Sequence, residues 1–455
     1  MAHPSDALVL FGATGDLAHK KTFTSLQSMV KRGHLSCPVV GVARNDWTVD
    51  QLKERARDGI DKFGGGVDEA AFGKLAELLH YVQGDYQDPS TYDRLHEAIG
   101  NAKRPLHYLA IPPSMFPTVV KQLDRSGLSK QARVVIEKPF GRDLASARAL
   151  NRLLHDVFDE SSIFRIDHYL GKEPVQNILY FRFSNTMLEP IWNRNYVNSI
   201  QITLAEDFGV EGRGAFYDEA GAIRDVLQNH ALQIASYLTM EPPSSYEAES
   251  LRDEKYKLLK SVRTLTPENV VRGQFEGYLD EQGVAPRSKV ETFAAVRLHI
   301  DSWRWEGVPV FIRVGKCMPA HTAEVLVTYH RPPYSIFAEH QPRQSNYVRF
   351  QIQPQVAIGM GARAKIPGER MLGQHVELYV CHDVGDEMEP YERLLGDAMD
   401  GDAMLFARQD AVEAAWRIVD PILGDAVPVV RYPKGSWGPP AADQLPHIVG
   451  GWHRI

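Results

Sequence analysis

The first third of the chain alternates short apolar runs with stretches long enough to form helices. The runs lie near residues 7–11, 39–43, 79–82, 106–111, 133–137 and 162–166. After the first run, Phe23, Leu26 and Val30 keep roughly helical spacing. Short buried strands that alternate with helices predict a doubly wound parallel sheet. We therefore expect an α/β domain over residues 1–173.

The pattern of apolar residues changes after about residue 174. β-branched enrichment or apolar alternation marks the runs SIQITLA, TFAAVRLHI, VPVFIRV, AEVLVTYH, YVRFQIQP and HVELYVC. Helical patterns near residues 218–239 and 407–418 accompany them. This mixture predicts a larger α+β domain with a mainly antiparallel sheet over residues 174–455.

Composition narrows the class of protein. The 455 residues are 44% hydrophobic and 24% charged, as in folded two- or three-domain proteins. A net charge of −7 argues against a nucleic-acid partner. No apolar run approaches the about eighteen residues of a membrane span, and the N-terminal residues lack a signal-peptide pattern. Cys37, Cys317 and Cys381 are isolated, which argues against disulfides or a metal site and favours the cytoplasm.

Polar motifs follow most of the predicted strands. GATGD comes after the first, AR after the second, PPS after the fourth, EKPFG after the fifth and DHYLG after the sixth. Ligands of open α/β sheets bind in the crevice at the carboxyl ends of the strands. We therefore expect these motifs to contribute to one site.

The motif after the first strand is a relaxed dinucleotide fingerprint. It reads Gly12-Ala13-Thr14-Gly15-Asp16-Leu17-Ala18. Glycine lets backbone amides approach a pyrophosphate at a helix N-terminus. A purely structural turn is the alternative, but the position after the first strand favours dinucleotide binding.

Arg44 follows the second strand, where an NAD site usually has Asp or Glu on the ribose hydroxyls. An arginine there can pair with a 2′-phosphate, which favours NADP and leaves NAD as a weaker alternative. The competing interpretation is a solvated surface arginine with Asp46 nearby.

Two further motifs carry clustered charge. Lys138 ends the fifth strand and precedes a proline that could hold a cis peptide and aim the ammonium into the crevice. His168, Tyr169 and Lys172 offer donors and positive charge for a phosphate from one short loop. The alternatives are a salt-bridged structural lysine and a tight polar turn in which Gly171 serves conformation.

The segments GATGDLAHKK, EKPFG, RIDHYLGKE and RDVLQNH occur in this order, and the sequence resembles the glucose-6-phosphate dehydrogenase family over nearly its whole length. The resemblance implies oxidation of the C1 hydroxyl of glucose 6-phosphate to a lactone, with hydride transfer to NADP, in the oxidative pentose phosphate pathway. It also implies a Rossmann-like domain joined to a large β+α domain, in a homodimer or homotetramer.

The resemblance assigns roles residue by residue. The implied catalytic residues are His230, the base, and Asp167, which orients it. The implied substrate residues are Lys138, His168, Tyr169, Lys172, Glu206, Asp225, Lys316 and His321. The implied cofactor residues are Gly12, Ala13, Thr14, Gly15, Asp16, Leu17, Lys21, Arg44 and Lys138, and no metal is expected.

Several of these residues have a plainer interpretation when taken alone. His230 shares a helical stripe with Ile223, Leu227 and Ile234, which is typical of a packed core histidine. Glu206 alone would be an ordinary carboxylate. The same holds for Asp225.

His321 departs from the family pattern, which commonly has a lysine or arginine at this position. Histidine near its reference pKa is mostly neutral at pH 7, so this position contributes less to binding an anionic sugar. The preferred sugar is therefore open, and a related dehydrogenase of another sugar or sugar phosphate is an alternative. A catalytically silent dinucleotide-binding sensor is the alternative from another class.

Overall fold

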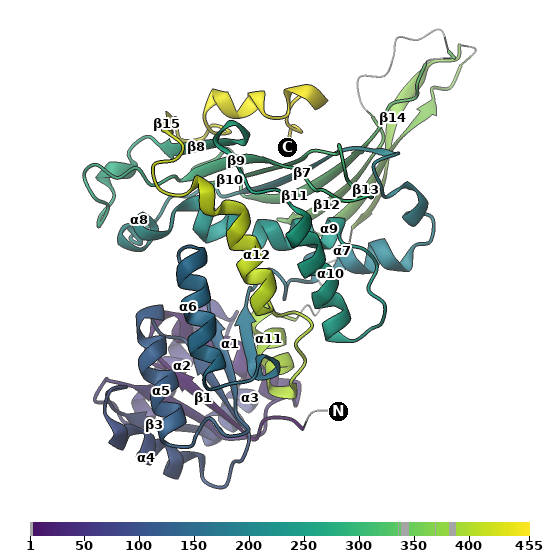
Figure 1. Ribbon diagram of the computed structural model, residues 1–455. Coiled ribbons are helices and arrows are strands. Elements are labelled where there is room, and N and C mark those ends of the chain that lie inside the picture. The colour runs from purple at the N-terminus through teal and green to yellow at the C-terminus, as the bar shows by residue number, and fades with distance from the viewer. Residues whose placement is uncertain (1–2, 335, 338–344, 369, 382–387) are drawn as a thin grey trace. The chain divides into compact units, whose positions relative to one another are not determined.

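The computed structural model describes residues 3–334, 336–337, 345–368, 370–381 and 388–455. The chain forms two compact units, each described by itself below (Figure 1). Unit 1 contains Met1–Glu173, Pro243–Asp253 and Met388–Glu413. Unit 2 contains Pro174–Pro242, Glu254–Glu387 and Ala414–Ile455.

Unit 1 thus takes in two later segments that fall within the range expected for the second domain. Long-range contacts explain the placement of the last of them. Arg133 donates a hydrogen bond to the carbonyl oxygen of Met399 at 2.6 Å, and Arg32 pairs with Glu392 at 3.0 Å. Contacts over such sequence separations leave no local signal in the sequence.

A six-stranded sheet forms the centre of unit 1, in the order β3-β2-β1-β4-β5-β6. All its strand pairs are parallel. The strands are β1 (Ala7–Phe11), β2 (Val39–Ala43), β3 (Leu79–Gln83), β4 (Pro105–Leu109), β5 (Arg133–Glu137) and β6 (Ile163–Ile166). Every residue of β1, β2 and β4 is buried, because helices cover both faces of such a sheet. The predicted doubly wound, Rossmann-like sheet is confirmed.

Most helices of unit 1 lie between these strands in the chain, and α11 (Pro390–Asp400) comes from the later segment of this unit. Those between the strands are α1 (Phe23–Lys31), α2 (Val49–Phe63), α3 (Glu69–Leu78), α4 (Pro89–Ile99), α5 (Phe116–Arg125) and α6 (Leu144–His155). A capping box starts α2, because Thr48 and Gln51 each accept a hydrogen bond from the other's backbone N–H. A π-helical segment, η1 (Ala18–Thr22), precedes α1.

Unit 2 is organised around a nine-stranded sheet in the order β14-β13-β12-β11-β7-β10-β9-β8-β15. Only the pairs β7–β10 and β8–β15 are parallel among the pairings of the described strands, so the predicted, mainly antiparallel sheet is confirmed. The strands are β7 (Val197–Ala205), β8 (Val270–Phe275), β9 (Phe293–Leu298), β10 (Val310–Gly315), β11 (Thr322–Tyr329), β12 (Tyr347–Gln353), β13 (Ala357–Lys365), β14 (Gly373–Cys381) and β15 (Val429–Tyr432).

The remaining helices are α7 (Glu173–Ser184), α8 (Gly214–Ala222), α9 (Leu232–Thr239), α10 (Ala248–Ser261) and α12 (Gln409–Val419). A second π-helical segment, η5 (Ile223–Ala231), lies between α8 and α9. Within the described part of the chain, no helix has the length and apolar character needed to cross a membrane.

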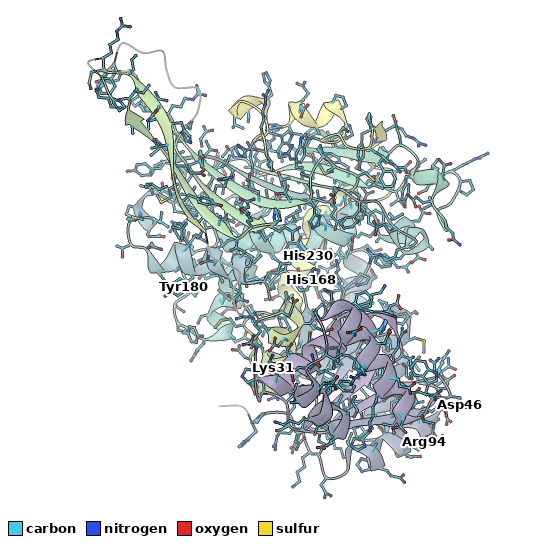
Figure 2. The ribbon with its side chains drawn as sticks, turned by 180° about the vertical axis from the view of Figure 1, so that it is seen from behind. Lys31, Asp46, Arg94, His168, Tyr180 and His230 are labelled. Carbon is cyan, nitrogen blue, oxygen red and sulfur yellow. The ribbon has the colours of Figure 1, made fainter. Side chains whose placement is uncertain are left out.

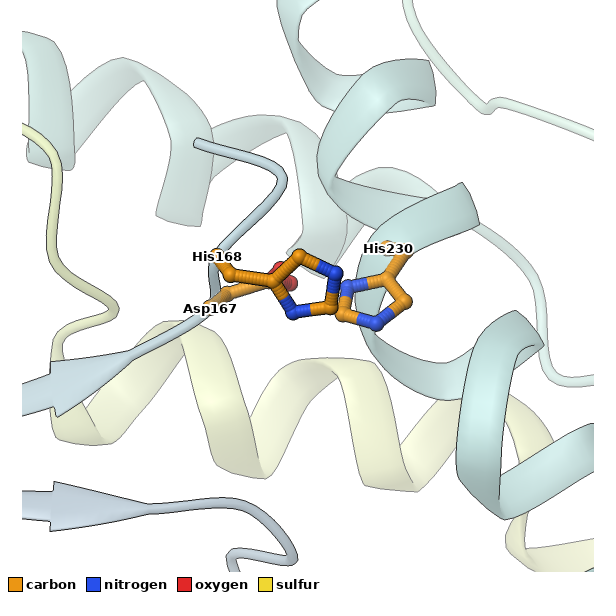
Figure 3. A group of neighbouring side chains, drawn as sticks. All are labelled: Asp167, His168 and His230. Atoms are coloured by element: carbon orange, nitrogen blue, oxygen red, sulfur yellow. The ribbon is translucent and has the colours of Figure 1, made fainter. Parts of the chain in front are cut away.

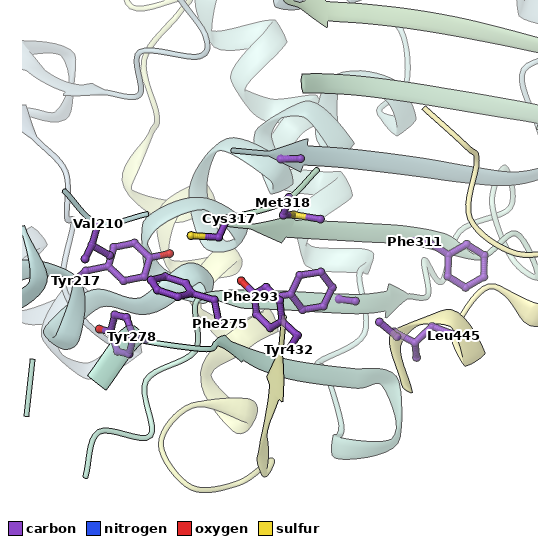
Figure 4. Close-up of a cluster of buried hydrophobic side chains, with 13 residues drawn as sticks. Val210, Tyr217, Phe275, Tyr278, Phe293, Phe311, Cys317, Met318, Tyr432 and Leu445 are labelled. Atoms are coloured by element: carbon purple, nitrogen blue, oxygen red, sulfur yellow. The ribbon is translucent and has the colours of Figure 1, made fainter. Parts of the chain in front are cut away.

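Aromatic side chains dominate one buried cluster of unit 2 (Figure 4). Phe275 and Tyr278 meet edge to face with ring centroids 5.4 Å apart, and Tyr217 lies 6.4 Å from Tyr278. Such arrangements stabilise a core beyond the area they bury. The cluster joins strands β8, β9 and β10 to helix α8.

Candidate active site

The glycine turn after β1 has the geometry that the fingerprint requires. Gly12 has a φ of +83°, and a Cβ there would lie 2.2 Å from the carbonyl oxygen of Ala110, so no other residue fits without a backbone shift. The N–H of Gly15 donates to the carbonyl oxygen of Gly12 at 2.9 Å. The turn continues into η1, which carries the exposed Lys21. These residues fit a dinucleotide pyrophosphate at a helix N-terminus.

The end of β2 is joined to two neighbouring loops. Thr14 donates a hydrogen bond to Asn45 at 2.8 Å. Arg44 pairs with Asp85, in the loop after β3, at 3.1 Å, and both side chains are about half exposed. Asp46 is also exposed (Figure 2). The guanidinium of Arg44 is therefore accessible, with Asp85 as its ion-pair partner.

Glu137 is a partly buried carboxylate to which the sequence motifs assigned no role. It accepts hydrogen bonds from the hydroxyls of Tyr108 at 2.7 Å and Tyr391 at 3.4 Å. Burial raises the pKa of Glu137 to about 7, although these hydrogen bonds and the charge of Lys138 oppose the rise. The peptide bond between Lys138 and Pro139 is cis, as expected. Tyr391 comes from α11, so no local pattern could have placed it here.

The loop after β6 carries the predicted phosphate-binding side chains, and Figure 3 shows His168 with Asp167. A carboxylate oxygen of Asp167 accepts a hydrogen bond from the backbone N–H of Tyr169 at 3.0 Å. The ammonium of Lys172 lies 4.0 Å from the centre of the Tyr169 ring. His168 stacks on Tyr391, with ring centroids 6.4 Å apart and planes 10° from parallel. The three predicted phosphate-binding side chains therefore share one compact loop in unit 1.

Gly171 in this loop serves close packing. A Cβ there would lie 2.8 Å from the carbonyl oxygen of Pro390 and 3.1 Å from the side chain of Leu394. Its φ is not in the left-handed region. The glycine thus allows α11 to approach the loop, which explains its presence better than turn conformation does.

In unit 2, the π-helical segment η5 carries both Asp225 and His230 (Figure 3 shows the latter). His230 is only 3% exposed, and its backbone N–H donates to the side chain of Asn229 at 2.6 Å. Leu227 is also fully buried, so burial fits both a base and a packed histidine. π-helical turns are rare and occur frequently at functional sites, which favours the base.

A second charged group of unit 2 is centred on Lys316, which is buried and follows β10. Its ammonium forms an ion pair with Glu206 and lies 5.1 Å from the ring centres of Phe208 and Tyr217. The structure therefore brings together Lys316 and Glu206, two of the predicted substrate-binding residues. Tyr217 was not predicted from the sequence.

His321 has polar neighbours of its own. Its ring nitrogen Nε2 lies 3.1 Å from the side-chain nitrogen of Gln353, and its Nδ1 lies 4.0 Å from Asp207. The ring also contacts Phe208, with centroids 5.6 Å apart. His321 thus lies close to Asp207 and Phe208, the two residues that follow Glu206 in the chain.

Comparisons with known proteins agree with this fold. Residues 9–177 match the family described as glucose-6-phosphate dehydrogenase, NAD binding domain, and residues 179–453 match its C-terminal domain. Glucose-6-phosphate 1-dehydrogenase 1 of Mycobacterium tuberculosis is 44% identical over 449 residues, which cover 98% of this chain and 96% of that protein.

The chain belongs to the glucose-6-phosphate dehydrogenase family. Solved structures of the family superimpose closely. A glucose-6-phosphate 1-dehydrogenase from Mycobacterium avium has a TM-score of 0.94 at 44% identity, covering 100% of this chain and 99% of that one. A glucose-6-phosphate dehydrogenase in complex with glucose 6-phosphate has a TM-score of 0.92 at 35% identity, with both chains fully covered. The resemblance found in the sequence is confirmed, and with it an oxidoreductase with a dinucleotide-binding domain.

Proposed function

We propose that this chain oxidises the C1 hydroxyl of glucose 6-phosphate to 6-phosphogluconolactone, with hydride transfer to NADP. The observation that carries the proposal is the end-to-end similarity to a dehydrogenase solved with glucose 6-phosphate. The silent sensor loses support, because Asp167, Lys172 and His230 are all present. We further propose residues 1–173 as the dinucleotide-binding domain and residues 174–455 as the substrate and dimerisation domain.

The residues proposed to bind the cofactor all lie in unit 1. The glycine turn would hold the pyrophosphate, and Arg44 would pair with the 2′-phosphate. Lys21 and Lys138 would lie between cofactor and sugar. When bound, the nicotinamide supplies the hydride acceptor.

The proposed substrate-binding residues are those that the family resemblance implies. His168, Tyr169 and Lys172 would bind the phosphate of the sugar, which carries almost two negative charges and needs several donors. Glu206 and Asp225 would accept hydrogen bonds from sugar hydroxyls, because ionised carboxylates are pure acceptors. Lys316 neutralises Glu206 and would add a contact to the substrate, with His321 beside it.

The chemical step needs a proton acceptor. His230 would take the proton of the C1 hydroxyl, and Asp167 would orient the imidazole and stabilise its charged form.

The absorbance of reduced nicotinamide tests the function directly. Purified protein is mixed with NADP or NAD and a panel of glucose 6-phosphate, other hexose phosphates and free sugars. We expect the fastest growth of the band with NADP and glucose 6-phosphate. A faster reaction with another sugar would establish the related dehydrogenase, and cofactor binding without growth would establish the sensor.

Arg44→Ala is expected to weaken NADP binding about tenfold or more while NAD binding changes little, because a charge-assisted contact is worth about 1.5–3 kcal/mol. Titration calorimetry with each cofactor measures both affinities. Arg57→Ala, which removes another exposed arginine of unit 1, serves as the control. Equal weakening of both cofactors would remove Arg44 from the 2′-phosphate site.

Asp85→Asn is expected to strengthen NADP binding several-fold without a comparable effect on NAD. The substitution releases Arg44 from its ion pair at 3.1 Å and removes a negative charge near the proposed 2′-phosphate. The gain should shrink as salt concentration rises, because both side chains are exposed. Weaker NADP binding would mean that Asp85 positions Arg44 productively.

Lys172→Ala is expected to raise the Michaelis constant for glucose 6-phosphate by about tenfold or more, with little effect on unphosphorylated glucose. Initial rates with both sugars give the comparison. Lys31→Ala removes an exposed lysine of α1 (Figure 2) and controls for net charge. A similar loss with both sugars would place Lys172 at the reacting end or in folding.

We expect a homodimer or homotetramer in the cytoplasm, and the family membership together with the isolated cysteines supports this. Sedimentation velocity at several protein concentrations would give the oligomeric state.

A further inference from the structure

Tyr217 is a buried tyrosine whose hydroxyl group has no hydrogen-bond partner in the described part of the chain. It lies on α8, is 1% exposed, and belongs to the aromatic cluster of Figure 4. Among the described protein groups, none forms a hydrogen bond with this hydroxyl. A buried phenol hydroxyl without a hydrogen-bond partner lowers the stability of the fold. Packing alone therefore does not explain why residue 217 is a tyrosine.

The other phenols of the cluster are satisfied. Tyr278 donates to Asp218 at 3.2 Å, and Tyr432 donates to the carbonyl oxygen of Lys316 at 2.7 Å. Phe275 and Phe293 show that the cluster also accepts aromatic rings without any hydroxyl. A phenylalanine at position 217 would therefore fill the core equally well, which leaves the hydroxyl itself unexplained by packing.

The neighbours of Tyr217 are the charged residues of the proposed sugar site. The ammonium of Lys316 lies 5.1 Å from the centre of its ring, and Lys316 is paired with Glu206. Burial, followed by the negative charges of Asp225 and Glu206, raises the pKa of Tyr217 well above its ordinary value. The phenol therefore stays protonated and available as a donor.

We propose that the hydroxyl of Tyr217 donates a hydrogen bond to a hydroxyl group of the sugar, beside Glu206 and Asp225, and thereby helps to determine substrate specificity. The inference rests on the proposed function and deepens it. A sugar hydroxyl that donates its proton to a carboxylate keeps oxygen lone pairs free to accept from a phenol. One O–H of the sugar can thus be bound by an acceptor and a donor at once, which an epimer or deoxy sugar cannot reproduce.

Tyr217→Phe tests the inference with glucose 6-phosphate and its 2-, 3- and 4-deoxy analogues. We expect kcat/KM for glucose 6-phosphate to fall about tenfold. For the one analogue that lacks the partner hydroxyl, wild type and variant should be equally efficient. The thermal unfolding midpoint without ligands should stay level or rise, because the substitution removes a buried polar group that has no protein partner.

Tyr278→Phe is the matched control, since it removes a phenol from the same cluster. It should lower the unfolding midpoint and leave sugar discrimination intact. Unchanged efficiency of Tyr217→Phe toward glucose 6-phosphate, or an equal fall with all four sugars, would overturn the inference. If wild type oxidised none of these sugars, the proposed function itself would fail instead.

Discussion

His230→Asn is expected to lower turnover with glucose 6-phosphate and NADP by roughly 10²–10⁴. Oxidation of an alcohol releases a proton as hydride leaves C1, and a neutral imidazole has a suitable pKa to accept it. Asparagine keeps a polar side chain of similar size but cannot act as a base. The affinities for both substrates and the thermal midpoint should therefore change little.

If His230 only packs in the core and is not the base, the opposite result is expected. The variant would then lose stability, and activity at low temperature would survive. His107 offers a matched control, because it is fully buried and its ring nitrogen lies 2.8 Å from the carbonyl oxygen of Leu128. Burial lowers the pKa of His107 to about 4, so this ring is neutral and structural. His107→Asn should thus lower the midpoint and spare turnover.

Asp167→Asn should reduce turnover in the same direction but by less, since the base remains and only its orienting charge is removed. Near-normal turnover in a folded His230→Asn enzyme would reject the assignment. Lys138 and Asp167 would then become the candidates for the proton acceptor.

Much of the fold follows from local patterns. Each of the six strands of unit 1 was predicted to within about two residues, because fully buried parallel strands are uninterrupted apolar runs between turn residues. Strand β13 was missed, because its AIGMGARAK contains two glycines, which are unusual in strands. The structure explains one of them: a Cβ on Gly361 would lie 2.4 Å from the ring of Tyr347 on the neighbouring strand.

In the candidate site too, residues that are adjacent in the sequence were predicted, whereas contacts between distant segments were not. The loop of Asp167 to Lys172 was predicted because its residues are contiguous. Tyr391 contacts Glu137 across 254 residues, and no periodicity records such a pairing. The hydroxyl of Tyr217 was invisible for another reason, because the sequence shows that a phenol exists and not that it lacks a partner.

Glu160 illustrates a distant interaction that governs stability. It forms two hydrogen bonds with Arg165, at 2.7 and 3.1 Å, and a further one with Arg252 at 3.2 Å. Both arginines are essentially fully buried. Glu160 also accepts the backbone N–H of Gln409 at 2.9 Å and lies 2.8 Å from the ring of His155. One carboxylate thus joins three separate segments of unit 1.

Glu160→Gln is expected to lower the free energy of unfolding at pH 7 by about 3–5 kcal/mol, because it leaves the buried guanidinium of Arg165 without its counter-charge and leaves that of Arg252 with Glu249 alone. Thermal or denaturant unfolding measures the loss. Glu69→Gln is the control, since Glu69 pairs with Arg57 on the exposed surface and its removal should hardly move the midpoint. An equally small effect of Glu160→Gln would show that the arginines find other partners.

The difference between wild type and Glu160→Gln should also depend on pH. Burial alone would raise the pKa of Glu160, but the charge and hydrogen bonds of Arg165 outweigh it and hold the pKa below its ordinary value. A lowered pKa in the folded state means that the stabilisation is complete above the unfolded pKa of about 4.3 and is lost as pH falls through the folded value. The two unfolding curves should therefore stay apart at pH 7 and converge in acid, and a separation that persists below about pH 3 would show that the charge of Glu160 is not its source.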